Sequence, residues 1–582
     1  MATNHDTPRV IWPKIFGIGL PYSGGEILPA VFKGSAYKWL HHEGGKLAQS
    51  LAYAQATGRA PLSEWPSATG FSDIFSVHKR HLPPLLLRDH LILLRDTFPD
   101  AYFVHTYRDP ADWIAVQFWA QDGDHRSVCA WHAGIEEAVL PDHWLNEHGE
   151  YAALCKQVFA DHPRYFEFNL TSDPIAKLYE FLDPAYALDP AAPVPALNVP
   201  SADIDAVVTY RAGLQQRPFQ PPAQMILARK VADFARQTED GHSKPQVLGT
   251  AAITLTKKYE VLDRTGAPVP LVQDNETGPY LLKPDTKGLE RGQATLNEML
   301  AHGAQPPLHI DMADARFLGI EGQRRPPRRT VAYNRRSGAK NITLWPLPGY
   351  HTLAPTGTPG GFPKDEIPFE DKEDRCVWLG NMTGRMSPVL TPDDRDRRSV
   401  YAIRDQALEL DEDSPDWANI ISDLDCVPRY RVVKTNHDNP DFEIGFVLRS
   451  KWRKLKESPA FAGLCVPKQR HSYFHKFRYI LSLAGNDTGS NFLFAASSNM
   501  LILKEEDGWE LFYTDAFKPW VHYVPLAEGA VDIDDKLKWA RENPGACSAM
   551  ARAATDVYDR LANPKTRHAY LTAIADGLNS EL

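Results

Sequence analysis

The sequence predicts an α/β protein built on parallel sheets, because strand and helix signals alternate along it. Apolar runs such as Ile11–Leu20 and Ala101–Tyr107 are typical of strands that are buried on both faces of a sheet. Stretches with helical spacing, such as Leu85–Phe98, follow them, which is the pattern of βαβ units. The same alternation returns beyond residue 370. At 582 residues the chain is too long for one core, so we expect two or three domains.

Composition and charge exclude several classes of protein. The formal net charge of -10 argues against a nucleic-acid partner. No apolar run reaches the roughly 20 residues that span a bilayer, and the start MATNHDTPRV has no signal-peptide pattern. We therefore expect a cytoplasmic protein with at most peripheral membrane association. The cysteines form no CxxC pair, which predicts free thiols and neither a metal site nor a disulfide framework.

Proline-rich stretches divide the chain. We assign a first domain to residues 1–190, a linker to 191–204, and a third and a fourth segment to 205–370 and 371–582. Further elements are expected in the first and last of these segments. They are strands at Arg164–Phe168, Arg375–Leu379, Phe477–Leu483 and Met500–Lys504, and helices at Pro174–Leu182, Arg395–Leu410, Asp534–Asn543 and 545–578.

A glycine-rich turn follows the first strand and precedes a helix, an arrangement that can hold phosphate on backbone N–H groups. This turn, together with the strand 102–108 that ends in Arg108-Asp-Pro, resembles the sulfotransferase family, and the resemblance covers about 180 residues. It implies a P-loop-like α/β domain in which Arg108 would bind the 3′-phosphate of the sulfate donor. The corresponding turn residues are Tyr22, Ser23 and Gly24.

The chemistry of that family is missing from the turn. Tyr22 stands where the family has the lysine that neutralises the transferring group, and Glu26 places a carboxylate where an anion should sit. We therefore expect a vestigial site in an inactive domain that serves packing, assembly or acceptor binding. Retained sulfuryl transfer is the alternative.

Three segments near the C-terminus place polar residues after predicted strands, where ligands bind in open α/β sheets. The first presents glycine, hydroxyl and basic groups for a diphosphate, and the second ends a buried strand in Gly-Asn-Asp. The third gathers aromatic residues around a lysine and a histidine. The candidate donor-binding residues are Trp378, Gly380, Thr383, Gly384, Arg385, Gly485, Asn486, Asp487, Asn491, Lys518 and His522.

In order and spacing these segments resemble glycosyltransferase family 90, most specifically in Lys518-Pro-Trp-Val-His-Tyr-Val-Pro525. The resemblance implies a GT-B architecture of two Rossmann-like domains, with 205–370 on the acceptor side and 371–582 on the donor side. It also implies inverting, metal-independent transfer of xylose, glucose or galactose from a UDP-sugar, which is a co-substrate, to a hydroxyl of a glycan such as capsule or lipopolysaccharide. No cofactor is expected, and neither the sugar nor the oligomeric state follows from the sequence.

Inverting transfer needs one carboxylate as general base. The resemblance places it before Gly288-Leu-Glu290, which makes Asp285 the first candidate, with Asp311 and Asp314 behind it. Leu379 stands where the family usually has arginine, so the diphosphate charge is expected to be met by Arg385, by Lys518, or by residues that the sequence does not reveal. Two other functions stay open: a bifunctional sulfotransferase–glycosyltransferase, and a non-catalytic scaffold that binds glycan or nucleotide.

Overall fold

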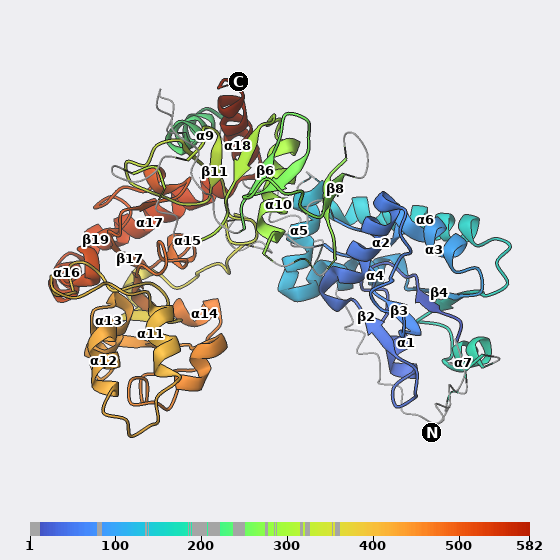
Figure 1. Ribbon diagram of the computed structural model, residues 1–582, viewed down its shortest axis with the longest axis horizontal. Helices are drawn as coiled ribbons and strands as arrows, with labels where there is room; N and C mark the ends of the chain where they lie inside the picture. Colours follow the sequence, from blue (N-terminus) through green and yellow to red (C-terminus); the bar gives the residue numbers. More distant parts are fainter. Residues whose placement is uncertain are drawn as a thin grey trace, which may run out of the picture. The chain divides into compact units, whose positions relative to one another are not determined.

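The computed structural model divides the chain into two compact units (Figure 1). The first contains Met1–Phe219 with Val269–Glu298, and the second contains Gln220–Pro268 with Met299–Leu582. The structure describes residues 12–77, 84–188, 207, 221–236, 251–273, 278–320 and 326–581, apart from short gaps at 134, 136, 138, 184, 187, 285, 287, 315–317, 352 and 355–360. The predicted linker 191–204 lies outside the described residues.

The first unit is built on a parallel five-stranded sheet that helices cover on both faces. Its order is β2 (Trp39–His41), β3 (Gly70–Ser72), β1 (Ile15–Gly17), β4 (Tyr102–Tyr107) and β5 (Tyr165–Asn169). Successive side chains of one strand pack into the hydrophobic cores on opposite faces of the sheet, because side chains alternate along a strand. Phe103 packs with α2 (Lys46–Thr57), α3 (Leu91–Thr97), α4 (Pro110–Trp119) and α6 (Leu140–Val158), whereas Val104 packs with α1 (Ile27–Val31) and α7 (Ala176–Leu182).

This unit confirms the predicted βαβ pattern. It differs from the prediction in the course of one helix and in the residues that the unit includes. The predicted helix Leu85–Phe98 is a 3₁₀ turn, Leu87–His90, that continues into α3, and α5 (Asp124–Ala133) follows α4. Residues 269–298, which we assigned to the acceptor-side segment, belong to this unit instead. They form the hairpin β8 (Leu271–Gln273) and β9 (Tyr280–Leu282) and most of α10 (Glu290–Ala301), where Asn297 bonds the backbone N–H and C=O of Tyr280.

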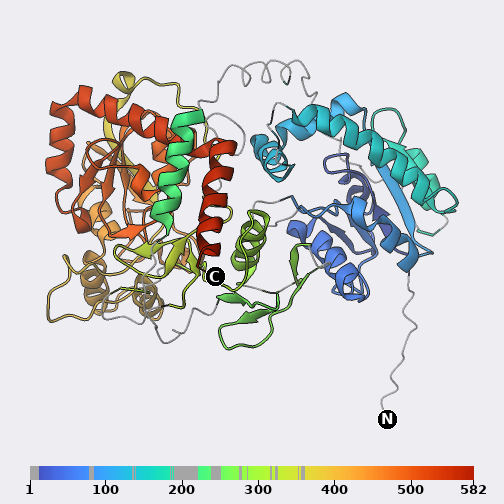
Figure 2. The same cartoon turned by 90° about the horizontal axis from the view of Figure 1, so that it is seen from above.

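The second unit contains two sheets. One has the order β13 (Ile342–Leu344), β11 (Thr330–Ala332), β10 (Leu308–Ile310), β6 (Ile253–Leu255) and β7 (Val261–Asp263); its first three strands are parallel and β6 and β7 are antiparallel. Helices α9 (Pro221–Ala235) and α18 (Pro564–Asn579) lie side by side next to it (Figure 2). Asn579 bonds Gly303 and Gln305, which ties α18 to the loop before β10.

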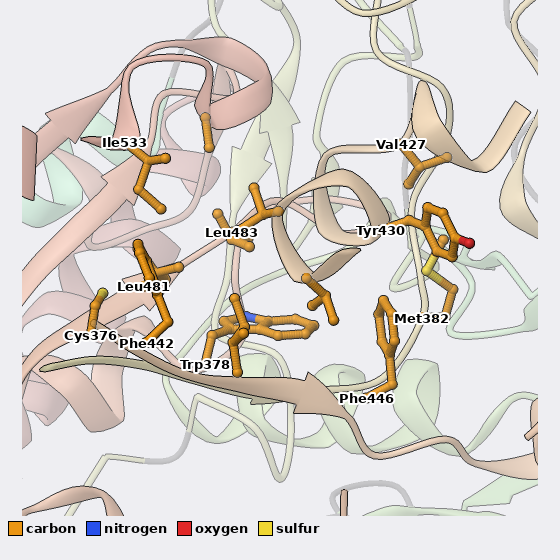
Figure 3. Close-up of a cluster of buried hydrophobic side chains, with 14 of the residues drawn as sticks. Cys376, Trp378, Met382, Val427, Tyr430, Phe442, Phe446, Leu481, Leu483 and Ile533 are labelled. Carbon is orange, nitrogen blue, oxygen red and sulfur yellow. The ribbon is translucent and has the colours of Figure 1, made fainter. Parts of the chain in front are cut away.

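The other sheet is wholly parallel, in the order β15 (Phe442–Phe446), β14 (Glu373–Gly380), β16 (Phe477–Ser482), β17 (Leu501–Glu505) and β19 (Val524–Leu526). Trp378, Phe446 and Leu481 lie in its largest core (Figure 3). The helices packed there are α11 (Val400–Ala407), α12 (Trp417–Asp425), α13 (Pro428–Asn436), α16 (Ile533–Glu542) and α17 (Pro544–Ala562), and the short helices α14 (His471–Phe474) and α15 (Phe492–Ala496) flank β16.

These elements confirm an α/β protein with several parallel sheets. The predicted strands near 375, 477 and 500 are β14, β16 and β17. The predicted tail helix 545–578 is broken in two, because the side chain of Asn563 caps α18 and Pro564 cannot continue α17. All six cysteines are free thiols. In the part of the chain that the structure describes, no helix is long and apolar enough to cross a bilayer.

A two-residue ladder joins the two sheets of the second unit. β12 (Arg335–Arg336) pairs antiparallel with β18 (Trp509–Glu510). Arg335 is fully buried there: its Nε donates to Glu510 at 2.8 Å, and its guanidinium also donates to the carbonyls of Phe234, Ala235 and Ile342. One side chain thus links α9, the first sheet and the second sheet.

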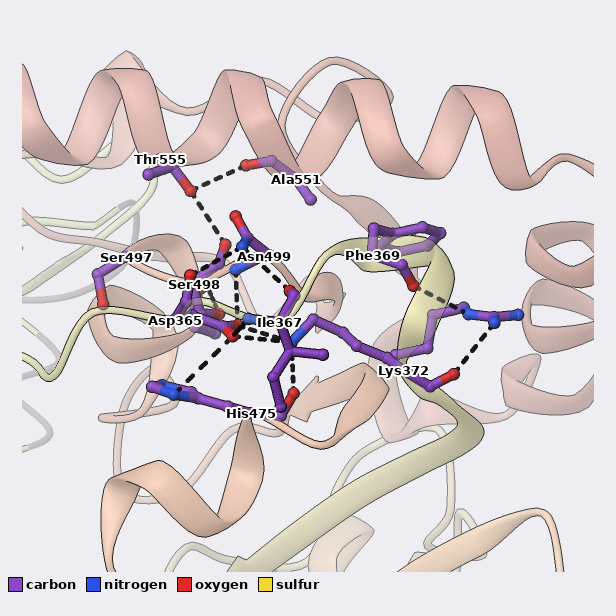
Figure 4. A network of polar contacts seen from close by, with 12 residues as sticks. Asp365, Ile367, Phe369, Lys372, His475, Ser497, Ser498, Asn499, Ala551 and Thr555 are labelled. Atoms are coloured by element: carbon purple, nitrogen blue, oxygen red, sulfur yellow. Dashed lines mark hydrogen bonds and ion pairs between the residues drawn. The ribbon is translucent and has the colours of Figure 1, made fainter.

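A buried ion pair fixes the segment that leads into β14. Lys372 and Asp365 are almost completely inaccessible, and Lys372 Nζ lies 2.8 Å and 3.0 Å from the two carboxylate oxygens (Figure 4). Asn499 donates its backbone N–H to the same carboxylate and its amide to the carbonyl of Asp365. Because both charges are paired and hydrogen-bonded, removing one of them leaves the other buried without compensation.

We expect Lys372→Met to lower the free energy of unfolding by about 3–5 kcal/mol, because the Asp365 carboxylate loses its cation. Urea unfolding measures the change. Lys364→Met is the matched control, since Lys364 is exposed and 3.9 Å from Glu366, a pair worth at most about 1 kcal/mol. Equal effects of the two substitutions would contradict the structural role of the buried pair.

Candidate active site

The strand order of the parallel sheet in the second unit defines where a ligand binds. In chain order β14 comes first, and β15 and β16 lie on its two sides. The connection from β14 to β15 and the connection from β16 to β17 therefore run in opposite directions. Ligands of such sheets bind beyond the carboxyl ends of the strands at this switch point. The turns there are residues 380–385 after β14 and 483–487 after β16, which are two of the three segments singled out from the sequence.

The two turns touch through their glycines. A Cβ on Gly384 would lie 2.8 Å from the carbonyl oxygen of Gly485, and Gly384 has a φ of 116°. Its N–H donates to Asn486 Oδ1 at 3.1 Å. Glycine is therefore required at 384 by conformation and by contact. We call residues 380–385 and 483–487 the paired turns.

The side chain of Arg429, on α13, donates hydrogen bonds to both of the paired turns. Its Nε and Nη2 donate to the carbonyls of Ala484 and Leu483, at 2.8 Å and 3.0 Å. Its Nη1 donates to the carbonyl of Asn381 at 3.0 Å and to Thr383 Oγ1. The guanidinium also lies 5.5 Å from the centre of the Trp378 ring. These bonds engage the guanidinium inside the protein, so Arg429 shapes the paired turns and adds a positive charge beneath them.

Glu505 at the end of β17 braces the same turns. One carboxylate oxygen accepts the N–H of Ala484 at 2.9 Å and the other accepts the N–H of Gly529 at 2.8 Å. The side chain is buried, and burial raises the pKa of Glu505 to about 7 even though the two backbone bonds and Arg429 act in the opposite direction. Its protonation state near neutral pH thus affects the position of Ala484.

The first sheet of the second unit presents polar residues to the paired turns. Tyr333 and Asn334 follow β11, and Asp314 follows β10. The Tyr333 hydroxyl lies 2.8 Å from Asp314 Oδ1 and 2.5 Å from Asp487 Oδ2. Asn334 Nδ2 donates to Asp487 Oδ2 at 2.7 Å, and Asn486 Nδ2 lies 3.4 Å from Asp314 Oδ2. Both sheets therefore contribute to one site.

Burial and neighbouring charges alter two groups of this site. Desolvation raises the pKa of Asp487, and the Asp314 and Asp507 carboxylates add to the shift, while Tyr333 and Asn334 oppose it. Desolvation, followed by the carboxylates of Asp487 and Asp314, raises the pKa of Tyr333 far above the ordinary value of a phenol. Tyr333 is therefore a neutral donor, and the pKa of Asp487 lies above the ordinary value of an aspartate.

The three candidate bases lie in different surroundings. Asp285 lies outside the described residues. Asp311 is fully buried, and its Oδ1 accepts the N–H of Ala313 at 3.3 Å, which shapes the turn after β10. Asp314 is exposed and faces the paired turns through Asn486. Of the two described candidates, only Asp314 is therefore accessible to an acceptor.

The other predicted donor-binding residues fall into four groups. Trp378 and Gly380 lie in β14, where the indole packs in the core beneath the turn. Arg385 is the last residue of the first of the paired turns, where it is exposed, and its backbone bridges Ser399. Asn491 begins α15 and donates to the carbonyl of Leu481 at 2.7 Å, which ties the helix back to β16.

Lys518 and His522 lie together in the turn that precedes β19. Lys518 donates its backbone N–H to His522 Nδ1 at 2.8 Å, and its ammonium pairs with Asp515. The His522 ring packs against Phe517, with ring centres 5.8 Å apart. Desolvation lowers the pKa of His522, which favours the neutral ring that accepts this bond.

The residues predicted for the vestigial site also come together, at the carboxyl end of β1. Tyr22 has a φ of 61° and bonds Gln121 through its hydroxyl, and burial raises its pKa to about 12. Ser23 donates to the carbonyl of Leu20, Gly24 has a φ of 89°, and buried Arg108 lies 3.3 Å from Asp112.

The carboxylate of Asp73 lies against this glycine turn. A Cβ on Gly25 would lie 2.0 Å from Asp73 Oδ1, so the Asp73 side chain rests against the turn. Burial raises the pKa of Asp73 to about 7, and the charge of Glu26 adds to the shift. Two carboxylates therefore lie where the resemblance would place an anion, which opposes anion binding.

Sequence reasoning missed Arg429, Glu505, Tyr333 and Asn334. Nothing in their local sequence marks them, because each acts on a turn from another part of the chain. The only signal was indirect: the absent arginine at Leu379 left the turn without a cation. Among the described residues, no group of three or more His, Cys, Asp or Glu could hold a metal ion.

Comparison with known proteins gives a family match that covers the second of the paired turns. Residues 428–566 match the model of Glycosyl transferase family 90. O-glucosyltransferase LpsA of Dichelobacter nodosus is 30% identical over 92 residues, which cover 16% of this chain and 29% of that protein. Protein O-glucosyltransferase 3 of Mus musculus is 28% identical over 97 residues, or 17% of this chain and 19% of that protein.

A viral protein shares a shorter segment. Uncharacterized protein 035R of Invertebrate iridescent virus 3 is 41% identical over 61 residues, or 10% of this chain and 6% of that protein. Each of these matches spans less than a third of the relative, so the similarity concerns one segment rather than the whole protein.

The raised pKa of Glu505 predicts a pH-dependent stability. Because the folded pKa of about 7 exceeds the ordinary 4.5, the stability that Glu505 contributes is present below pH 4.5 and is lost as pH rises through 7. We expect the free energy of unfolding of the wild type to fall by about 3 kcal/mol more than that of Glu505→Gln between pH 4.5 and pH 8. Urea unfolding at both pH values measures this, with exposed Glu457→Gln as the control. Parallel pH profiles for wild type and Glu505→Gln would contradict the shift.

Proposed function

We propose that this protein transfers a sugar from a nucleoside diphosphate to a hydroxyl group of a glycan, because residues 428–566 match the model of Glycosyl transferase family 90. The observation that carries the proposal is the meeting of the paired turns with Asp314 at the switch point of a parallel sheet. The finer proposal is a UDP-sugar of xylose, glucose or galactose as donor, and a glycan of the capsule or lipopolysaccharide type as acceptor. The names of LpsA and protein O-glucosyltransferase 3 support glucose among these sugars.

Asp314 is our proposal for the general base. Its carboxylate takes the proton of the acceptor hydroxyl, and the acceptor oxygen forms a bond to the anomeric carbon. The bond from that carbon to the diphosphate breaks, and its electron pair leaves with the nucleoside diphosphate. Attack opposite the leaving group inverts the anomeric centre. The exposure of Asp314 and its position opposite the paired turns support this role.

The paired turns are our proposal for the diphosphate site. The charge of Arg429 beneath them favours an anion above, although its donor groups are engaged by the turns themselves. Arg385 is exposed beside Gly384 and is the second cation near the turns. Positive charge placed in advance of the reaction stabilises the negative charge that develops on the leaving diphosphate. This proposal uses no metal ion.

Ligand-induced stabilisation tests the donor site. We expect one UDP-sugar to raise the thermal midpoint of the full chain, because a ligand at 100 times its dissociation constant stabilises the fold by about 2.7 kcal/mol. The screen compares UDP, UDP-glucose, UDP-galactose, UDP-xylose and GDP-sugars with adenosine 3′,5′-bisphosphate. A shift with the bisphosphate would support sulfuryl transfer by the first unit. Absence of any shift would favour the scaffold and contradict the proposed function.

Replacement of the base tests the chemistry. We expect Asp314→Asn to bind the donor as the wild type does but to lower kcat at least 100-fold, because the amide cannot accept the proton. Transfer of radiolabelled sugar measures the rate, and exposed Asp413→Asn is the control. Loss of turnover in Asp285→Asn with normal turnover in Asp314→Asn would instead assign the base to Asp285.

A further inference from the structure

The Tyr333 hydroxyl lies between two carboxylates in the proposed active site. It is 2.8 Å from Asp314 Oδ1 and 2.5 Å from Asp487 Oδ2. Tyr333 is buried, and its ring packs near His351, with ring centres 6.0 Å apart. The phenol is therefore held at one place, between a carboxylate of the first sheet and a carboxylate of the second.

Counting protons shows what this geometry requires. A phenol hydroxyl has one hydrogen to donate, whereas an ionised carboxylate can only accept. With both carboxylates ionised, one of the two close contacts would be between an oxygen and a carboxylate with no hydrogen between them. Both contacts are hydrogen bonds only if one of the carboxylates carries a proton. The half-buried Asp487 is favoured over the exposed Asp314, because desolvation penalises the charged form of Asp487.

We propose that Tyr333 is a positioning residue, and that its hydroxyl receives a hydrogen bond from protonated Asp487 and donates one to the ionised Asp314. This inference rests on the proposed function, since it concerns the base of the same reaction. Neither residue contacts the reacting atoms in this arrangement. Tyr333 fixes Asp314 Oδ1, and Oδ2, the oxygen on the side of Asn486, receives the proton of the acceptor.

The step keeps atoms and electrons in balance. The acceptor proton moves to Asp314 Oδ2 while the acceptor oxygen bonds to the anomeric carbon and the diphosphate leaves with the electron pair of its bond. The protons on Tyr333 and Asp487 stay in place throughout. After transfer, Asp314 returns its proton to water, and the site is restored without any further reactant.

The groups around Asp487 explain why one of the two carboxylates that contact Tyr333 carries a proton. Asn334 donates to Asp487 at 2.7 Å, and the charge of Arg429 acts on it as well. The acidic groups around Asp487 penalise a second negative charge there, and they are Asp314 and Asp507. Tyr513 and His351 are the neighbouring titratable rings.

Two variants test the arrangement by their rates and pH profiles. We expect Tyr333→Phe to lower kcat tenfold or more with the donor KM changed less than twofold, and to move the acid limb of kcat to higher pH, because ionised Asp314 loses a hydrogen bond. In the wild type kcat should fall at alkaline pH, as Asp487 loses its proton. Asp487→Asn cannot lose that proton, so the alkaline fall should be absent in this variant.

The matched control is Tyr186→Phe. It also removes a buried phenol hydroxyl, which donates to the carbonyl of Pro13 at 2.6 Å, but Tyr186 lies in the core of the first unit and takes no part in the site. We expect this control to keep the kcat and pH profile of the wild type. A wild-type rate and profile in Tyr333→Phe, or an alkaline fall that persists in Asp487→Asn, would overturn the inference.

A measurement that does not depend on catalysis distinguishes failure of this inference from failure of the proposed function. Infrared spectroscopy of the full chain at pH 7 should show a protonated-carboxyl band that Asp487→Asn reduces and that Asp413→Asn leaves unchanged. Loss of the band in the first variant supports the shared proton even if no donor sugar is found. An identical spectrum for Asp487→Asn and the wild type overturns the shared proton, whatever the enzyme transfers.

Discussion

The guanidinium of Arg429 is the interaction on which the site of the second unit depends. It bonds backbone carbonyls of two turns that belong to different strands, and those turns are close enough for only glycine at 384 and 485. Without a cation at this point, four carbonyl and hydroxyl groups would lie against one another unsatisfied. Glu505 completes the arrangement from the opposite direction, since it accepts the N–H of Ala484. Two side chains, Arg429 on α13 and Glu505 on β17, therefore set the shape of the proposed diphosphate site.

The two sheets of the second unit divide the chemistry between them. The wholly parallel sheet supplies the turns, and the sheet of β10 and β11 supplies Asp314, Tyr333 and Asn334. The β12–β18 ladder and Arg335 hold the sheets in a defined relation, so the hydrogen bonds between them can be specific. The glycine turns of the two units differ in their charged neighbours. In the first unit, the carboxylates of Asp73 and Glu26 lie near the glycine turn and oppose an anion. In the second unit, the paired turns are bonded by the guanidinium of Arg429.

The sequence predicted the parallel sheets and the position of the paired turns, because both depend on local patterns. Buried parallel strands are continuous apolar runs, and the glycines after β14 and β16 mark their ends. It could not predict Arg429 or Tyr333 as parts of the site, since their roles come from contacts between distant segments. It also missed the break at Asn563–Pro564 and assigned 269–298 to the wrong unit. These errors share a cause, because helical spacing and composition do not show which sheet an element packs against.

The position of α18 affects the order in which the chain can fold. This helix packs beside α9, and Asn579 bonds the loop that leads into β10, yet it is translated after every strand of the second sheet. On the ribosome, the loop before β10 must wait for these contacts until the whole of the other sheet has emerged. The sheet of β10, β11 and β13 can therefore complete its packing only after the other sheet, although all of its strands are translated earlier.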